Sequence, residues 1–301
     1  MRDLLHGGHA VVNYDMDTGH HILCQVIEPG DLQEIKSVHG DITDLPHLCR
    51  SVKEHNIDAI VHLASWQIPA SNANPAQALP IVSGGLVNVL ETARLFGIKR
   101  VVWSSSIAVF GPQSEYGPGK VKNDAWHRPQ SVYGACKSLG EFLLNYYFNQ
   151  YKVDSIGLRF TAVYGIGRER GLSSFTTEMI RRAAYGEPYD VPFGDDVIDW
   201  QYVEDVSGIV LRSLEVETTR TRVFNTRGDV RAVKSGVEYL KKLVPGAQLE
   251  VKPGTFGIAW EYDTTPLESE LGYTPGVTME EGILKTLNGY LKQKGKEPVV
   301  L

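Results

Sequence analysis

The sequence predicts an α/β protein: a doubly wound parallel sheet followed by a smaller lobe of mixed helices and strands. Up to about residue 165, short apolar runs alternate with longer amphipathic segments, a rhythm typical of a parallel sheet covered by helices on both faces. Beyond residue 165, Gly and Pro become more frequent and the rhythm loosens. We therefore place one domain at residues 1–165 and the lobe mainly at residues 166–301, with segments such as 195–230 crossing back.

The first elements follow from apolar patterning and glycine stops. Residues 3–5 have the pattern of a helix end, which Gly7 and Gly8 terminate, and residues 10–15 that of a buried strand ending at Asp15. After a polar connection, the patterns predict strands over residues 35–39, 58–64, 100–104 and 155–160. They predict helices over residues 45–55, 75–96, 131–151, 176–185, 233–243 and 279–293.

Composition narrows the possible functions. The chain has 301 residues, of which 42% are hydrophobic and 22% charged, enough for one large core and a smaller lobe. A formal net charge of −6 favours neither nucleic acid nor an anionic membrane as a partner. The three cysteines have no paired spacing, and no apolar run has the length of a membrane span. We expect a reduced, cytoplasmic protein that acts on a small molecule.

The nine histidines do not predict a metal site. All of them lie before residue 128, and none stands at ligand spacing with a cysteine or carboxylate partner. We expect exposed or capping histidines and no bound metal.

Tyr133 and Lys137 form the most informative motif. They lie four residues apart within a predicted helix, so both side chains project from one face. A lysine ammonium and a positively charged nicotinamide beside a phenol would lower its pKa from about 10, making Tyr133 a general acid or base near neutral pH.

A serine at a strand end accompanies this pair. The strand over residues 100–104 runs into Ser104, Ser105 and Ser106, at the carboxyl edge where parallel sheets bind ligands. Ser106 can hold a substrate oxygen while Tyr133 moves the proton. The alternative is structural: serines that satisfy backbone groups in a turn, and a tyrosine on a helix surface.

With these residues in this order, the chain resembles the extended short-chain dehydrogenases/reductases, the NAD-dependent epimerase/dehydratase family that includes UDP-galactose 4-epimerase. The resemblance covers essentially the whole length. It is carried by "HGDITD" (39–44), "VHLAS" (61–65), "SSSIAVFG" (104–111), "YGACK" (133–137), "LRFTAVYGIG" (158–167), "DWQYVEDV" (199–206) and "ELGYTP" (270–275). Several ordered motifs together are more specific than any one of them.

The resemblance implies a Rossmann-like fold, NAD as cofactor, and the roles of individual residues. By motif match, Ser106, Tyr133 and Lys137 transfer the proton while NAD takes or gives a hydride. Asp15 closes the second strand of the family unit, where a carboxylate binds the adenosine ribose and favours NAD over NADP, although it could equally cap a turn. The other residues matched to cofactor contacts, besides Tyr133 and Lys137, are Asp41, Ile42, Leu63, Ala64, Ser65, Phe160 and Val163.

One part of the family pattern has no counterpart here. The family begins with a strand and a GxxGxxG loop that binds the pyrophosphate, whereas this sequence opens on the following helix. We weigh three explanations: a truncated sequence or misassigned start, which we favour; a lobe that has closed up or recruited another segment, such as residues 298–301; or a remnant that no longer binds the dinucleotide. NAD binding is expected to be weakened or lost if the loop is truly absent.

Substrate-side departures point away from a nucleotide sugar. Val82, Ala162 and Ile198 stand where the family places two asparagines and the arginine that grips the diphosphate. Arg168 and Arg170 could supply cations for a carboxylate or phosphate, although such a loop is more often simply solvated. We place Ser105 and Ser106 on the substrate, and Trp66 either at an apolar pocket or in the core.

The resulting hypothesis is an NAD-dependent oxidoreductase or epimerase acting on a hydroxyl or ketone carbon of a sugar-like or polyhydroxy substrate. The runner-up is a nucleotide-sugar 4-epimerase or dehydratase, the dehydratase being disfavoured because "SSSIAVFG" lacks an acidic pair. The rival from another class is a non-catalytic dinucleotide sensor or a truncated remnant. The two long helices resemble the pair that forms the family's dimer interface, so we expect a homodimer.

Overall fold

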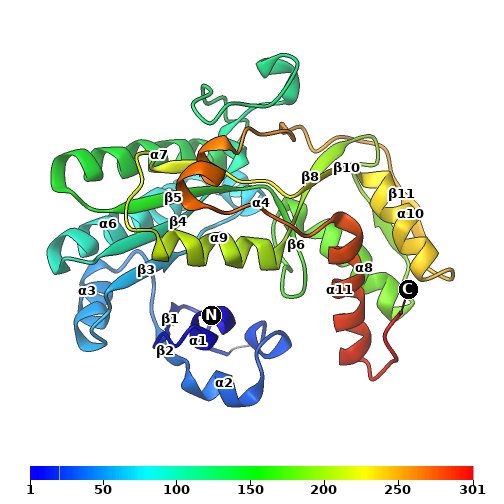
Figure 1. Cartoon of the computed structure of the whole chain (residues 1–301), viewed down its shortest axis with the longest axis horizontal. Coiled ribbons are helices and arrows are strands. Elements are labelled where there is room, and N and C mark those ends of the chain that lie inside the picture. Colours follow the sequence, from blue (N-terminus) through cyan, green and yellow to red (C-terminus); the bar gives the residue numbers. More distant parts are fainter. Residues whose placement is uncertain (20, 301) are drawn as a thin grey trace.

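The computed structural model describes residues 1–19 and 21–300. Its centre is a parallel sheet of four strands in the order β3 (Ala59–His62), β4 (Arg100–Ser106), β5 (Ser155–Phe160) and β9 (Val223–Asn225), with helices on both faces (Figure 1). The predicted α/β fold class is confirmed.

Alternation along β4 explains why helices cover both faces. Val101 and Trp103 point to one face and pack against α6 (Gly85–Phe96) and α7 (Val132–Tyr151). Val102 points to the other face and packs against α9 (Val203–Glu215). Successive strand side chains face opposite ways, so a strand buried on both sides is apolar throughout its buried length.

A second, two-stranded parallel sheet lies beside the first. It pairs β1 (Val12–Asp15) with β2 (Lys36–His39). Within residues 1–19 and 21–300, no strand joins β1 to β3, so the two sheets are separate. Short helices α1 (Arg2–His6), α2 (Pro29–Glu34) and α3 (Leu45–Glu54) surround the pair. Ser207 of α9 donates a hydrogen bond of 2.6 Å to Asp3, which ties α1 to the main sheet.

The chain end does not fill the space between β1 and β3. Asn288 of α11 (Met279–Gln293) exchanges two hydrogen bonds with the backbone of Val299, at 2.8 and 3.0 Å. Val299 also packs against the core of the lobe. The expectation that residues 298–301 replace the central strand is therefore wrong for residues 298–300, because this segment is held against α11; residue 301 lies outside the described residues.

The lobe is built on two small sheets. One has the order β10 (Asp229–Ala232), β8 (Val197–Tyr202), β6 (Ala162–Tyr164), and the other pairs β7 (Tyr189–Val191) with β11 (Leu249–Val251). Helices α8 (Phe175–Tyr185), α10 (Val233–Leu243) and α11 pack around Trp200, which is fully buried.

Most predicted helices occur with small shifts, but the one over residues 75–96 is interrupted. It consists of α5 (Pro75–Ala78), a π-helical turn over Leu79–Gly84, and α6. Pro80 lies inside the turn, and because proline lacks an N–H, a widened turn is one way to continue the helix past it. The patterns do not predict helices α2, α4 (Ile68–Ala73) and α9. Helices α2 and α4 are too short to show a clear periodicity. Helix α9 begins within the "DWQYVEDV" motif, whose residues were matched to the family rather than to a helix.

Candidate active site

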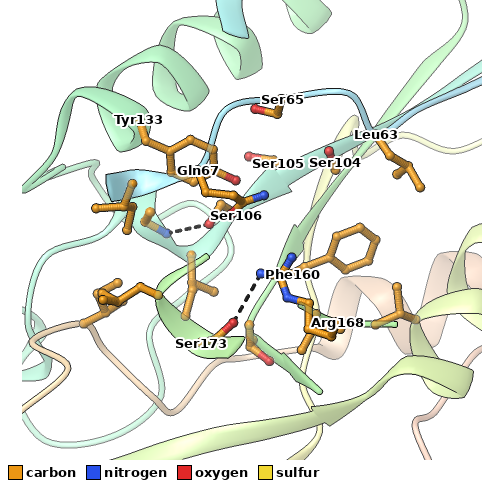
Figure 2. Close-up of a pocket in the computed structure, with 18 of the residues that line it drawn as sticks. Leu63, Ser65, Gln67, Ser104, Ser105, Ser106, Tyr133, Phe160, Arg168 and Ser173 are labelled. Carbon is orange, nitrogen blue, oxygen red and sulfur yellow. Dashed lines mark hydrogen bonds between the residues drawn. The ribbon is translucent and has the colours of Figure 1, made fainter. Parts of the chain in front are cut away.

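The candidate site is a cavity of about 210 Å³ at the carboxyl end of β4, between the main sheet and the lobe (Figure 2). It contains eight of the residues that the sequence nominated for cofactor or substrate contacts. These are Leu63, Ser65, Ser105, Ser106, Tyr133, Phe160, Val163 and Arg168. They come from three strand ends, from α7 and from the loop after β6, so only the fold brings them together.

Ser106 is the last residue of β4 and caps the short 3₁₀ turn over Ile107–Val109. Its Oγ accepts a hydrogen bond of 3.1 Å from the Ala108 N–H. Its side chain lines the same cavity as the Tyr133 side chain. The structural role, capping of the turn, is therefore present, and it leaves the Ser106 hydroxyl at the cavity.

Tyr133 projects into the cavity from the first turn of α7. Ser131 caps this helix by accepting a hydrogen bond of 3.0 Å from the Gly134 N–H. Burial raises the pKa of the Tyr133 phenol, while the neighbouring Ser106 hydroxyl and the charge of Arg168 act in the opposite direction. The sequence assigned the lowering effect to Lys137 together with a bound nicotinamide; within the chain itself, Ser106 and Arg168 supply it.

Lys137 lies one turn further along α7 and is 1% exposed. Its Nζ donates a hydrogen bond of 2.5 Å to the backbone oxygen of Ser104 and lies 4.7 Å from the ring centroid of Trp103 and 5.3 Å from that of Tyr133. Burial lowers the pKa of this amine to about 7. The ammonium is thus fixed to the β4 backbone under the tyrosine ring.

Glycine permits the close approach of α7 to the site. A methyl group at Gly134 would overlap the backbone oxygen of Ala108. Because Ala108 follows Ser106 by two residues, this contact sets how near the helix that carries Tyr133 lies to the turn that carries Ser106.

A buried ionic network lies behind the serines, and the sequence analysis did not find it. Glu141 on α7 accepts hydrogen bonds from Ser105 at 2.5 Å and from the Arg159 guanidinium at 2.7 and 2.9 Å, and it lies 3.1 Å from His127. Burial alone would raise the pKa of Glu141, but its bonds to Arg159 and His127 hold it at about 2. The signal was present: Glu141 follows Lys137 by four residues, on the face that carries Tyr133.

Ser105 consequently has a different environment from Ser106. It lines the cavity, yet its hydroxyl proton is committed to Glu141 and its side chain is 2% exposed. The sequence placed both serines on the substrate. In the structure the two hydroxyls have different partners, because the Ser106 Oγ caps the 3₁₀ turn over Ile107–Val109 and accepts from the Ala108 N–H.

Three predicted cofactor residues lie outside the cavity, beside the small sheet. The Asp15 carboxylate, exposed at the end of β1, accepts a hydrogen bond of 2.8 Å from the Asp17 N–H. Asp41 accepts two bonds of 2.8 Å from the backbone and hydroxyl of Thr43, and Ile42 packs against Gly85 of α6.

The residues that follow β3 also differ in whether they line the cavity. Leu63 and Ser65 line the cavity, whereas Ala64 is exposed and does not. Leu63 is 56% exposed, an unusual state for a leucine at a strand end, and it lies near Phe160 (Figure 2). Together these two side chains present an apolar surface that suits a flat ring such as nicotinamide.

Dinucleotide-binding features are thus present at two separate places. The cavity offers the apolar surface beside Tyr133, and the β1 end offers the carboxylate of Asp15. The 301 residues contain no GxxGxxG sequence. The residues present therefore fit the two ends of NAD, and the sequence supplies no glycine-rich loop for the pyrophosphate.

The residues predicted to contact the substrate also differ in whether they line the cavity. Trp66 does not line the cavity but packs against the buried cluster that contains Tyr133, which is the core alternative. Arg168 lines the cavity, whereas Arg170 is exposed. The three residues that replace the family's polar contacts are all buried and line no part of this cavity: Val82, Ala162 and Ile198.

The structure also bears on metal binding and on membrane insertion. Within residues 1–19 and 21–300, no group of three His, Cys, Asp or Glu side chains is arranged to hold a metal ion. Over the same residues, no helix combines the length and apolarity needed to cross a membrane.

The expectation of exposed or capping histidines is wrong for His62, which is buried at the end of β3, where burial and the charge of Lys137 lower its pKa to about 3.

Comparison with known proteins agrees with this architecture. Residues 2–226 match the model of the NAD dependent epimerase/dehydratase family. An uncharacterized protein of Methanocaldococcus jannaschii is 30% identical over 265 residues, which cover 84% of this chain and 78% of that protein. An uncharacterized epimerase/dehydratase of Staphylococcus aureus is 27% identical over 251 residues, covering 78% and 76%.

Solved structures share the fold at lower identity. The UDP-glucose 4-epimerase of Thermotoga maritima, solved with UDP-glucose, has a TM-score of 0.84 at 23% identity and covers 97% of this chain and 94% of its own. An L-threonine dehydrogenase of Cupriavidus necator has a TM-score of 0.82 at 23% identity, covering 94% and 92%. The ordered motifs, the parallel sheet and the matched residues agree, and the chain belongs to the NAD-dependent epimerase/dehydratase family of extended short-chain dehydrogenases/reductases.

Proposed function

We propose that this protein is an NAD-dependent oxidoreductase or epimerase that acts on a hydroxyl or ketone carbon of a sugar-like or polyhydroxy substrate. The observation that carries the proposal is the meeting of Ser106 and Tyr133 in one cavity, with Lys137 fixed directly beneath the tyrosine ring. A phenol and a serine hydroxyl that line one cavity, with a lysine buried beside the phenol, are the groups that proton transfer to or from a substrate oxygen requires.

The proposed roles follow from the hydrogen bonds. A substrate oxygen between Ser106 and Tyr133 would lie within reach of both hydroxyls. Ser106 already accepts from the Ala108 N–H, so its own proton is available for that oxygen. Because burial raises the pKa of Tyr133, the resting phenol is protonated, which suits it to give a proton to a carbonyl oxygen.

In the oxidative direction the same atoms act in reverse. The substrate O–H proton passes to Tyr133 Oη, which requires the phenolate, and the C–O bond becomes a C=O bond as the C–H bond breaks. When bound, NAD would accept the hydride from that carbon, and its positive ring would help to lower the pKa of the phenol. Leu63, Ser65, Phe160 and Val163 are the residues that would hold the nicotinamide end, and Asp15 the adenosine end.

The solved neighbours support both branches of the proposal. An epimerase and a dehydrogenase share the fold at equal sequence identity, so similarity does not choose between them. A nucleotide-sugar 4-epimerase is the second candidate, because one of these neighbours is a UDP-glucose 4-epimerase solved with UDP-glucose. Against it, Ile198 stands where the family places the arginine that grips the diphosphate, and this isoleucine is buried in the lobe core.

The proposal is tested by NAD binding and by one substitution. Calorimetry should detect binding of NAD to the 301-residue chain. NADH formation should be screened with sugars, sugar acids and L-threonine, whereas with UDP-glucose the epimeric product should be measured, because an epimerase returns the hydride and forms no net NADH. Tyr133→Phe should abolish turnover while the thermal unfolding temperature and NAD affinity stay near those of the wild type. Ser131→Ala, a matched change at the helix cap, should lower stability by about 1 kcal/mol and leave turnover measurable.

Two outcomes would overturn the proposal. Undiminished turnover by Tyr133→Phe would remove the phenol from the mechanism. Absence of NAD binding together with absence of turnover would favour the rival function, a non-catalytic member of the family.

A further inference from the structure

Arg168 is a cation inside the cavity without an anion of its own. Its only side-chain hydrogen bond within residues 1–19 and 21–300 is from Nη2 to Ser173 Oγ, at 3.3 Å, and its Nε is buried with no partner (Figure 2). Arg168 is partly buried, and a guanidinium withdrawn from water is normally paired or fully hydrogen-bonded, because an unpaired charge there is costly. The missing partner is therefore expected to come from outside the chain.

The neighbouring charges in the loop do not compensate Arg168. Glu169 turns away and accepts a hydrogen bond of 2.8 Å from Gln25, with His21 at 3.4 Å. Arg170 is exposed and lines no part of the cavity. Among the residues that line the cavity there is no Asp or Glu and no other Lys or Arg. Its wall thus carries a single uncompensated positive charge.

Uncharged polar groups surround this guanidinium. A methyl group at Gly171 would lie 3.0 Å from Arg168 Nη2 and 3.1 Å from Gln67 Oε1, so these two side chains lie beside each other, and both line the cavity. Ser173 accepts a hydrogen bond from Arg168, so its own hydroxyl proton is free. The guanidinium, the Ser173 hydroxyl and the Gln67 Nε2 are all donors, which the two oxygens of a carboxylate can accept.

We propose that Arg168, with Gln67 and Ser173, binds a carboxylate carried by the substrate itself, so that the substrate is a small hydroxy acid or its keto form. This inference rests on the proposed function, because it places the reacting hydroxyl of the substrate between Tyr133 and Ser106 while the substrate carboxylate lies at Arg168.

Charge and size favour a carboxylate over a diphosphate. One guanidinium balances one negative charge, whereas a diphosphate carries at least two and would leave a charge unpaired in a largely apolar site. A cavity of about 210 Å³ is also smaller than the pockets typical of drug-sized ligands. Arg168 and Tyr133 line the same cavity, so the carboxylate site and the reacting group can be reached by one small molecule.

The test compares acids with their amides. NADH formation is measured with D-gluconate, 3-hydroxybutyrate and L-threonine and with the corresponding primary amides. The comparison uses the wild type, Arg168→Met, Arg168→Lys and the control Arg170→Met. We expect the wild type to prefer at least one acid over its amide. For that acid, Arg168→Met should raise KM by about 10- to 150-fold, the range of a charged hydrogen bond, and abolish the preference for acid over amide.

The other variants define what the effect means. Arg168→Lys keeps the charge but not the fork and should fall between the wild type and Arg168→Met. Arg170→Met should behave as the wild type, because its side chain is exposed. Thermal unfolding checks that each variant is folded. An acid-to-amide preference that is absent in the wild type, or unchanged in Arg168→Met, would overturn the carboxylate site.

Two further measurements separate this inference from its alternatives. Calorimetric NAD affinity should be the same in the wild type and Arg168→Met; an equal loss for NAD and for the acid would assign Arg168 to the phosphates of the dinucleotide instead. If no alcohol is turned over, the proposed function fails, but the carboxylate site can still be tested by binding alone. Nuclear magnetic resonance titration with the same acids then compares Tyr133→Phe with the double variant that also carries Arg168→Met. Binding that depends on Arg168 supports it, and binding that is absent or independent of Arg168 overturns it.

Discussion

The ammonium of Lys137 lies 2.5 Å from the backbone oxygen of Ser104 and 4.7 Å from the centre of the Trp103 ring. This pair of contacts ties α7 to β4 at the level of the candidate site. Since the strand carries Ser106 and the helix carries Tyr133, the lysine positions one catalytic candidate against the other. It does so at an energetic cost, because the amine is buried without a carboxylate in contact.

The cost of burying the Lys137 amine predicts how the effect of Lys137→Met on the free energy of unfolding depends on pH. Burial lowers the pKa of Lys137 to about 7, so folding must strip a proton from it whenever the pH lies between that value and about 10.4, the value in the unfolded chain. The destabilisation is largest below about pH 7 and fades as the pH rises. Urea unfolding should show the variant more stable than the wild type at about pH 6, with a gap that narrows by about pH 9.

The control for this prediction is Lys99→Met. The Lys99 side chain is 78% exposed, so removing its charge should change stability little and without the same pH dependence. A gap between Lys137→Met and the wild type that stays constant or widens with rising pH would contradict the burial argument.

A second prediction concerns the ionic network behind the serines. Glu141→Gln leaves the Arg159 guanidinium buried without its anion and should lower the free energy of unfolding by about 3–5 kcal/mol at neutral pH. The folded pKa of Glu141 is about 2, below its unfolded value, so the stability it contributes is present above about pH 4.3 and is lost as the pH falls toward 2.

Denaturant titration at two pH values checks this. The gap between the wild type and Glu141→Gln should be smaller at about pH 3 than at about pH 7. Asp58→Asn, which breaks the exposed pair with Lys99, should cost less than about 0.5 kcal/mol. Equal costs for the two variants would show that the buried network contributes no more than a surface pair.

A third prediction tests the approach of α7 to the Ser106 turn. Alanine at Gly134 would overlap the backbone oxygen of Ala108, which cannot move as a flexible side chain would. Overpacking of this kind costs about 1–3 kcal/mol, against a gain in helix propensity of about 1 kcal/mol. The helix must shift, so kcat/KM should fall by about 100-fold, since a misplacement of about 1 Å has that effect on catalysis.

Ala135→Gly is the matched control. Its position is exposed on the same turn, and glycine there costs about 1 kcal/mol in helix propensity without steric overlap. It should lower the unfolding temperature and keep kcat/KM. If both variants lost activity in proportion to stability, the contact at Gly134 would have no special role in positioning Tyr133.

We also propose a homodimer formed through α6 and α7. The two helices pack against each other and carry large exposed apolar side chains, which are Leu95 and Phe96 on α6 and Leu139, Phe142 and Tyr146 on α7. Phe142 is 63% exposed and stacks on Tyr146, with ring centroids 6.2 Å apart. Large apolar side chains exposed together on two neighbouring helices are typical of an interface.

Light scattering after size exclusion checks the dimer. The wild type should have twice the mass of the chain, and Phe142→Glu should shift it toward the monomer. Trp126→Glu, at a residue that is 62% exposed but lies outside the two helices, should leave the mass unchanged. A monomeric wild type would contradict the proposal.

The sequence by itself determined the features that depend on neighbours along the chain. The start of α7 at its Ser131 cap, the shared face of Tyr133 and Lys137, and the alternation along β4 all follow from helical or strand periodicity and local capping. The family followed from several such motifs in a given order.

Only the tertiary structure decided which polar groups are already paired. Ser105 and Ser106 are adjacent and identical in the sequence, yet one donates to Glu141, 36 residues away, and the other meets Tyr133. Arg168 and Arg170 differ in the same way, one facing the cavity without an anion and the other facing solvent. Burial and hydrogen-bond pairing across distant segments set these differences, and local periodicity carries no information about them.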